Sequence, residues 1–197
     1  MNKRQTIIKR KTNETDVEMK LDIDGTGSCE IQTPVGFLNH MLELFAGHGL
    51  FNLSVVANGS IRIDEHHIVE DVGIVLGQSF AEILSEKKSI RRYGFFILPM
   101  DEALATVTID FAGRYSFRFE CPFVRDKVGD LSTELVRHFW NSFAQNAKVN
   151  LYIKVENGEN EHHKIEAIFK ATARAIRAAC EIDERMINKI PSTKGRL

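Results

Sequence analysis

The stretches EHHIVE at residues 65–70 and EHHKIE at residues 161–166 repeat one pattern of histidine and glutamate in the two halves of the chain. A further histidine precedes each copy, His40 in the first half and His138 in the second. These two sets contain six of the seven histidines. Because imidazole and carboxylate groups are common metal ligands, the duplicated set predicts a metal enzyme that arose by internal duplication.

The repetition extends beyond the histidines. Residues 37–53 and 135–151 share a histidine, a Phe-Ala pair and an Asn-Leu pair at the same spacing. Self-similarity over two long units predicts a pseudo-twofold domain rather than a solenoid of short repeats. We therefore expect one domain over residues 1–197, with halves at about 1–90 and 91–190 and a C-terminal tail at 191–197.

Hydrophobic periodicity predicts the same order of elements in both halves. In the first half, strands are expected at 5–12 and 16–24, then a third short strand, a helix at 36–48, a strand at 50–57 and a helix from residue 64. In the second half, strands are expected near 94–99, 103–112 and 115–121, then a helix near 132–146, a strand near 149–156 and a helix near 162–180. Each half is β-β-β-α-β-α, which predicts an α+β fold with helices packed between or against two mixed sheets.

Composition limits the classes of function. A chain of 197 residues with 43% hydrophobic residues can bury one sizeable core. A formal net charge of -1 argues against nucleic acid as a partner, and no apolar run approaches the ~20 residues of a membrane span. The three cysteines, Cys29, Cys121 and Cys180, form no C-x-x-C motif, so we expect structural thiols in a reducing compartment.

Helix geometry divides the ligands into two groups. Residues four apart share a helix face, so His66 and Glu70 can bind one ion. Adjacent residues diverge by about 100°, so His67 must face in another direction. The same holds in the second copy, which predicts two metal sites. Asp71 also stands four residues after a histidine, but its repeat counterpart is Ala167, so we do not expect it to be a ligand.

The ligand types restrict the metal. Imidazole and carboxylate without thiolate suit Mn, Fe, Zn or Ni and disfavour a structural zinc site. Three imidazoles and one carboxylate around an octahedral ion leave two positions for a substrate.

Several segments together resemble the imidazoleglycerol-phosphate dehydratase family: GFLNHML at 36–42, HHIVEDVGI at 66–74, RYG at 92–94, HHKIEAIFK at 162–170 and PSTKG at 191–195. The resemblance implies a duplicated fold like the second domain of ribosomal protein S5. It also implies a cytoplasmic hydro-lyase of histidine biosynthesis, which converts D-erythro-imidazole-glycerol phosphate to imidazole-acetol phosphate. Two Mn(2+) ions per subunit and a 24-subunit shell, with sites between subunits, are further implications.

The same resemblance assigns the site residues, and it assigns substrate binding to the C-terminal tail at 191–197. One metal site would use His40, His67, His162 and Glu166, and the other would use His66, Glu70, His138 and His163. Glu14 would be the general acid–base, with Asp101 as its loose counterpart in the repeat. Substrate and phosphate contacts would come from Glu14, His40, His48, His66, His67, Glu70, Arg92, Arg114, His162, Lys170, Ser192, Thr193 and Lys194. Asn39, Leu44 and Asn52 depart from common family patterns, and we expect any effect to fall on substrate affinity.

Two other classes of protein fit the histidine pattern. A binuclear hydrolase places its ions ~3.5–4 Å apart, which calls for a bridging carboxylate. A metal-storage shell needs no acid–base residue and no Ser-Thr-Lys tail. Formation of the ketone product by the manganese-loaded protein distinguishes the dehydratase from both.

Overall fold

The computed structural model describes residues 3–197 and has the predicted order of elements in both halves. The first half comprises β1 (Gln5–Lys11), β2 (Thr15–Asp22), β3 (Cys29–Gln32), α1 (Gly36–Gly49), β4 (Asn52–Gly59) and α2 (His66–Ile83). The second comprises β5 (Tyr93–Met100), β6 (Ala103–Asp110), β7 (Ser116–Glu120), β8 (Lys127–Val128), β9 (Leu131–Ser132), α3 (Thr133–Ala147), β10 (Asn150–Asn157), α4 (Glu161–Cys180) and the 3-10 helix η1 (Glu184–Met186). Residues 1–2, which the single-domain prediction includes, lie outside the described residues.

The two sheets have the same topology, as duplication requires. Their strand orders are β1-β2-β4-β3 and β5-β6-β10-β7. In each sheet the first three strands pair antiparallel, and the last strand is parallel to its neighbour. The small β8–β9 hairpin is an addition in the second half that the sequence pattern did not predict.

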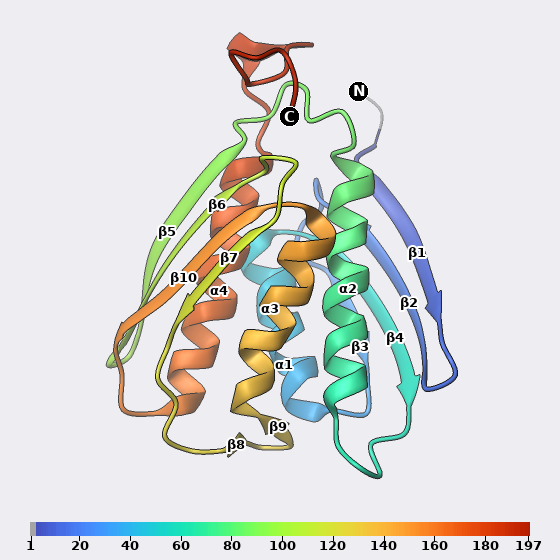
Figure 1. The fold of residues 1–197 in the computed structure, drawn as a ribbon, viewed down its shortest axis with the longest axis vertical. Coiled ribbons are helices and arrows are strands. Elements are labelled where there is room, and N and C mark those ends of the chain that lie inside the picture. Colours follow the sequence, from blue (N-terminus) through green and yellow to red (C-terminus); the bar gives the residue numbers. More distant parts are fainter. Residues whose placement is uncertain (1–2) are drawn as a thin grey trace.

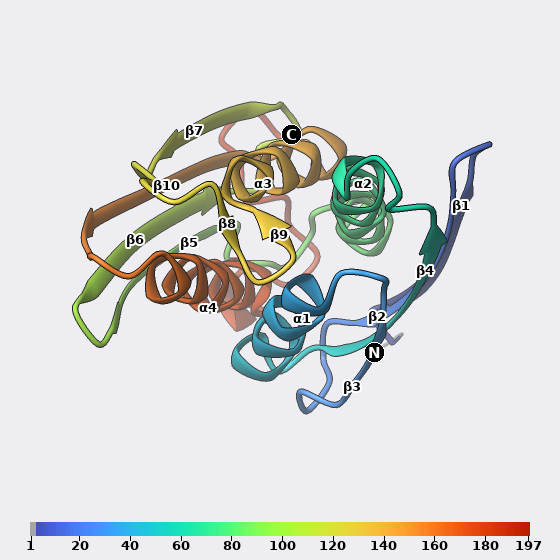
Figure 2. The same cartoon turned by 90° about the horizontal axis from the view of Figure 1, so that it is seen from below.

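The four helices lie between the two sheets (Figures 1 and 2). Alternate residues of the strands face these helices: Val17, Met19 and Leu21 on β2 are buried, as are Ala105 and Val107 on β6. This period of two is what a strand with one covered face shows. The mixed α+β architecture predicted from the sequence is confirmed.

Helices α2 and α3 approach closely because two glycines lie at their contact. A Cβ atom on Gly73 would lie 2.8 Å from the carbonyl oxygen of Phe139, and one on Gly77 would lie 2.5 Å from that of Phe143. Glycine therefore permits a contact between backbones that any side chain would prevent. The contact holds the ligand-bearing first turns of the two helices beside one another.

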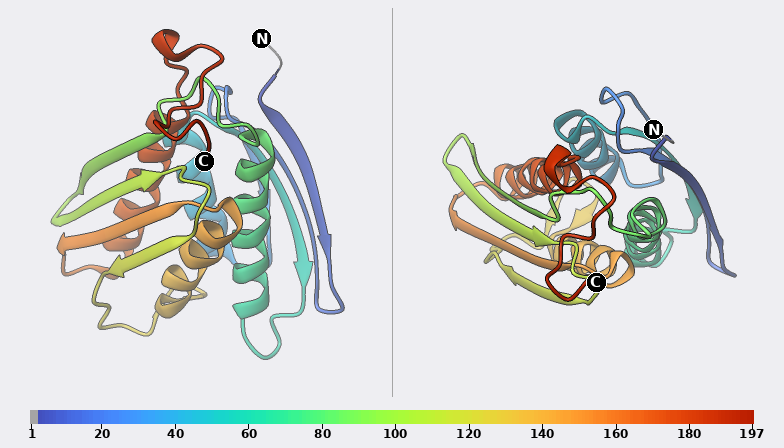
Figure 3. Two further views of the ribbon diagram at one scale, coloured as in Figure 1. Left: turned by 45° about the horizontal axis from the view of Figure 1, so that its top comes forward. Right: turned by 90° about the horizontal axis from the view of Figure 1, so that it is seen from above.

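All four helices begin at the end of the molecule where β8 and β9 lie (Figure 1). The C-terminal segment that follows α4 lies at the opposite end, beyond the loop that joins α2 to β5 (Figure 3). Because the six histidines of the repeated sets occur in the first two turns of their helices, this arrangement gathers them at one end of the fold. None of the helices within residues 3–197 is both long enough and apolar enough to cross a membrane.

Candidate metal centre

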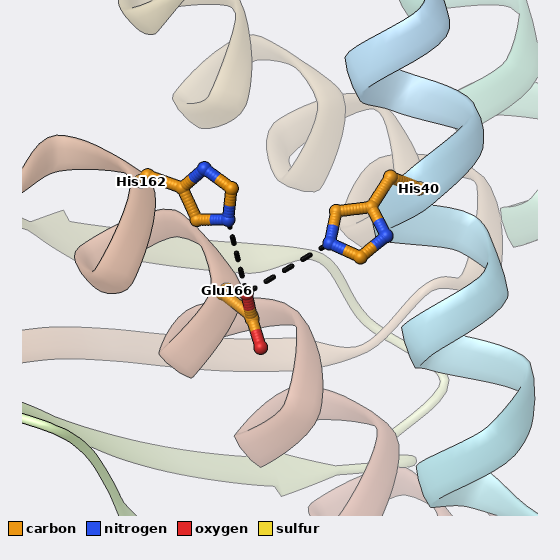
Figure 4. A group of neighbouring side chains, drawn as sticks. All are labelled: His40, His162 and Glu166. Atoms are coloured by element: carbon orange, nitrogen blue, oxygen red, sulfur yellow. Dashed lines mark hydrogen bonds and ion pairs between the residues drawn. The ribbon is translucent and has the colours of Figure 1, made fainter.

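Three predicted ligands form a first cluster between α1 and α4 (Figure 4). His162 Nε2 lies 3.1 Å from Glu166 Oε2, and His40 Nε2 lies 3.8 Å from the same oxygen. The first pair is spaced four residues apart on α4, whereas His40 comes from the other half of the chain. The cluster therefore exists only because the two halves pack together.

A second cluster lies between α2 and α3 and consists of His66, Glu70 and His138. His138 Nε2 lies 3.3 Å from Glu70 Oε1, and His66 Nε2 lies 4.0 Å from Glu70 Oε2. Exchange of the two halves converts this set into the first cluster. Each cluster again takes two ligands from one helix and one histidine from the other half.

Both clusters have the donor set of a divalent cation site. In each, one atom from every ligand lies within 4.8 Å of the others. In addition, His138 Nε2 is buried and makes no hydrogen bond to any residue within 3–197. Its contact with Glu70 at 3.3 Å is an ion-pair distance without the geometry of a hydrogen bond, and a buried nitrogen left without a hydrogen bond is costly unless something binds it, as a metal ion would. The residues present therefore fit a metal.

The second histidine of each pair lies outside these clusters. The His66 and His67 ring planes are 72° apart, and those of His162 and His163 are 80° apart. His67 Nδ1 lies 3.4 Å from Glu14 Oε2, and His163 Nδ1 lies 2.7 Å from Glu102 Oε2. The structure thus brings together three residues of each predicted set of four within one chain, and leaves the adjacent histidine facing an acidic side chain.

These two acidic side chains differ in how they are held. Glu102 accepts hydrogen bonds from the backbone N–H groups of Asn160 and Glu159, at 2.8 and 3.1 Å. The Asn160 bond and the His163 contact lower the pKa of Glu102 to about 2. Glu14, in the β1–β2 turn, is exposed and has His67 as its side-chain contact within the described residues. Glu14 is therefore the less constrained of the two carboxylates.

The glutamate of the first cluster is buried and paired with a cation. Lys170 Nζ contacts Glu166 Oε1 from one turn farther along α4. Burial by itself raises the pKa of Glu166, but the contacts with Lys170 and His162 outweigh it and lower the pKa. His48 lies near this lysine, and burial, followed by the charges of Lys170 and Arg174, lowers the pKa of His48. The cations around the first cluster therefore favour the ionised form of Glu166 and the neutral form of His48.

Most of the other predicted phosphate contacts lie around a different pocket, at the end of the C-terminal segment. This pocket has a volume of about 540 Å³, and its lining includes Arg92, Arg114, Ser192, Thr193 and Lys194. Arg92 donates hydrogen bonds to both carboxylate oxygens of Asp110 at 2.7 and 3.1 Å and to the carbonyl of Pro191 at 2.8 Å. Asp110 thereby holds the guanidinium at the pocket wall. A slightly larger hollow of about 560 Å³ lies over β1–β4 and contains none of the predicted ligands.

The residues that depart from family patterns have structural contacts. Asn39 binds both backbone groups of Thr33, through a donated and an accepted hydrogen bond of 3.1 Å each. Asn52 accepts from the backbone N–H of Thr26 at 2.9 Å, and Leu44 packs against the core. Asp71, which we did not expect to be a ligand, is buried and binds Arg10 at 2.8 Å and Thr15.

Sequence reasoning missed two acidic residues, Glu65 and Glu161, which directly precede the histidine pairs. Both are buried, with 4% and 1% of their surface exposed. The signal that could have identified them is the repeat itself, because the glutamate recurs in both copies while Asp71 does not.

The imidazoleglycerol-phosphate dehydratase family model matches residues 33–176. The imidazoleglycerol-phosphate dehydratase of Bacillus pumilus is 52% identical over 194 residues, covering 98% of this chain and 100% of the relative. That of Caldicellulosiruptor saccharolyticus is 49% identical over the full length of both chains, 197 residues. The crystal structure of the Staphylococcus aureus enzyme superposes with a TM-score of 0.83 at 39% identity, covering 91% of this chain and 99% of that one. The Pyrococcus furiosus structure superposes with a TM-score of 0.82 at 32% identity, covering 96% and 100%.

Proposed function

Because this chain belongs to the imidazoleglycerol-phosphate dehydratase family, it is a hydro-lyase, and we propose that it removes water from D-erythro-imidazole-glycerol phosphate to give imidazole-acetol phosphate in histidine biosynthesis. The reaction breaks a C–O bond next to the imidazole ring and a C–H bond on the neighbouring carbon. Neither the C–H proton nor the hydroxyl leaves readily without help. The site must therefore bind the ring, move protons and hold the phosphate.

We propose that the two clusters bind two Mn(2+) ions per subunit. His40, His162 and Glu166 would hold one ion, and His66, Glu70 and His138 the other. When bound, such ions act as Lewis acids that orient the imidazole ring and ease loss of its proton. His67 and His163 would complete the two sets for neighbouring subunits. The half-exposed side chain of His67 is accessible to such a partner.

Glu14 is the proposed acid–base residue. General acid–base catalysis needs a carboxylate that can take up and release a proton near the reacting atoms. Glu14 contacts a proposed ligand histidine, but its carboxylate accepts no hydrogen bond from a backbone N–H group of residues 3–197, in contrast to that of Glu102. Its carboxylate can therefore accept the C–H proton and return a proton to the departing hydroxyl.

We propose that the phosphate binds to Arg92, Arg114, Ser192, Thr193 and Lys194 of one subunit and to Lys170 and His48 of a neighbouring subunit, since the two groups lie apart within one chain. Planar guanidinium groups suit phosphate because they donate two parallel hydrogen bonds. Asp110 supports this role by orienting Arg92. The remaining expectations, a single domain with a substrate-binding tail, a 24-subunit shell and a cytoplasmic location, are proposed from family membership.

The observation that carries the proposal is the pair of matching His-His-Glu clusters in a member of this family. No residue within 3–197 belongs to both clusters, so neither offers the shared carboxylate that a binuclear hydrolase needs.

The test compares manganese-loaded protein with the same protein stripped by a chelator. We expect the loaded protein alone to convert imidazole-glycerol phosphate to the ketone, with activity restored when Mn(2+) is returned. A loaded protein that binds two ions per subunit but forms no ketone would point to storage, and release of inorganic phosphate would point to a hydrolase.

A further inference from the structure

The starts of all four ligand-bearing helices are joined to one short stretch, residues 124–132, which we call the β8–β9 segment. Seen from this end, β8 and β9 lie among the helices (Figure 2). We propose that Asp130, Glu65 and Glu161 are positioning residues that tie the two metal clusters to this segment, so that a change at any one of them alters metal binding at both. The inference rests on the proposed metal function.

Helix α1, which carries His40, is capped by the β8–β9 segment. Its own N-cap residue, Val35, has no side chain that can accept a hydrogen bond. Asp130 instead accepts from the backbone N–H groups of Gly36 at 2.6 Å and Phe37 at 2.8 Å. The carboxylate satisfies two free N–H groups and complements the positive end of the helix. The direction of α1 therefore depends on Asp130.

Helix α2, which carries His66, is joined to the segment through the residue directly before that histidine. Glu65 Oε1 accepts hydrogen bonds from the backbone N–H of Ser132 at 2.7 Å and from its hydroxyl at 2.6 Å. Ser132 is the N-cap residue of α3, but its hydroxyl goes to Glu65 and not to its own helix. Glu65 thus joins the start of α2 to the start of α3.

Helix α4 is joined in the corresponding way through Glu161, directly before His162. Its Oε1 accepts from the backbone N–H of Val124 at 2.7 Å. Its Oε2 lies 2.8 Å from Lys164 Nζ, and this lysine also donates to the Pro122 carbonyl at 3.1 Å. A carboxylate in so buried a place is costly unless it is paired, and here Oε1 accepts backbone hydrogen bonds while Oε2 has the ion pair with Lys164 in place of a hydrogen bond.

Helix α3, which carries His138, starts directly after the segment. Thr133 donates its backbone N–H to the Asp126 carbonyl at 2.9 Å and its hydroxyl to the Arg125 carbonyl at 2.8 Å. The helices of both clusters therefore share one support.

Each cluster combines two of the four helices. The first combines α1 with α4 and depends on Asp130 and Glu161, while the second combines α2 with α3 and depends on Glu65 and Ser132. Groups that orient metal ligands from outside the ligand set typically change metal affinity by about 10–100-fold when they are altered. Because the hairpin occurs in one half only, a single segment serves both clusters, and a disturbance at Asp130 reaches the second cluster through Ser132.

The test measures Mn(2+) binding to Asp130→Ala and Asp130→Asn in the full-length protein. Equilibrium dialysis gives total affinity, and anomalous scattering from crystals grown at limiting Mn(2+) gives the occupancy of each cluster. We expect Asp130→Ala to weaken both clusters by about 10-fold or more. Asp130→Asn should recover part of this loss, because its amide oxygen can still accept from Phe37. Turnover of either variant should recover at saturating Mn(2+).

Two control variants separate positioning from general stability. Asp183→Ala removes the carboxylate that accepts from Arg185 at 2.9 Å at the start of η1, at the other end of the fold. Val75→Ala weakens the buried face of α2 without touching the segment. Both should bind Mn(2+) as the unaltered protein does. Glu65→Gln and Glu161→Gln repeat the test from the helix side and decide it if Asp130→Ala does not fold.

Unchanged affinity in the folded Asp130, Glu65 and Glu161 variants would overturn the inference, and so would a loss confined to the cluster nearest each substitution. Such results would leave the proposed function intact, because the unaltered protein would still bind two ions and form the ketone. An unaltered protein that neither binds Mn(2+) nor dehydrates would remove the proposed function itself, and the inference with it.

Discussion

The two ligand clusters have the same sequence pattern but hold their glutamates differently. The Glu166 side chain is 9% exposed and pairs with Lys170, whereas the Glu70 side chain is 36% exposed. The position that corresponds to Lys170 in the first half is Ile74. The first cluster therefore contains a compensated, buried carboxylate, and the second a more accessible one. Duplication preserved the ligands, while residues one helical turn away gave each cluster its own electrostatic surroundings.

The largest expected effect tests whether both clusters are needed. We expect His162→Ala and His66→Ala each to remove one of the two ions per subunit and to lower kcat by about 1000-fold or more, because an ion can supply several kcal/mol of charge stabilisation. Metal analysis with the dehydration assay measures both quantities. Full turnover in either variant would show that one cluster is dispensable.

The next comparison concerns Glu14 and Glu102, the acids that contact His67 and His163. Glu14→Gln should lower kcat by about 100-fold or more while both ions remain bound, because proton transfer is lost. Glu102→Gln is the matched control and should change kcat only a few-fold, since Glu102 is engaged with the start of α4. Unchanged turnover in Glu14→Gln would remove this residue from its proposed role.

Acid should empty both clusters while the protein stays folded. A proton competes with the ion for each imidazole, so affinity should fall by up to about 10-fold per pH unit for every histidine ligand below about pH 6. The pKa of Glu166 lies below its ordinary 4.5, so the stability from its ionised form is present above that value and is lost only as pH falls farther, through the folded pKa. Dialysis against Mn(2+) between pH 5 and 8 measures release, and full occupancy at pH 5 would contradict the expectation.

The smallest expected effect is a difference in stability between substitutions at Lys170, beside the first cluster, and at Ile74, beside the second. Lys170→Met leaves the buried Glu166 without its cation and should lower the free energy of unfolding of the metal-free protein by about 2 kcal/mol. Bound Mn(2+) should recover much of this loss, because the ion replaces the missing charge. Ile74→Met at the equivalent position should cost less than about 1.5 kcal/mol and show no such recovery. Chemical denaturation with and without metal provides the comparison, and equal behaviour of the two variants would show that Lys170 has no special part.

Much of the fold could be predicted because it depends on local spacing. The element boundaries agree with the structure to within about two residues at most ends, since strand and helix periods are visible in the order of apolar residues. The β8–β9 hairpin was not predicted, because strands of two residues are too short to show any period. The contact of Asp130 with α1 was also beyond prediction, since the two segments are far apart in the chain.

The sequence alone determined which residues occur in pairs on a helix face. The spacing of His66 from Glu70, and of His162 from Glu166, follows from the geometry of a single helix and needs no other part of the molecule. Helix spacing does not say which third histidine joins each pair; the family resemblance named His40 and His138, and the structure groups them in the same way. Only the tertiary structure decided how deeply each glutamate is buried and what the acid before each histidine pair binds. Those features depend on packing between segments that are distant along the chain, and a linear order of residues does not specify the angle and distance at which two helices meet.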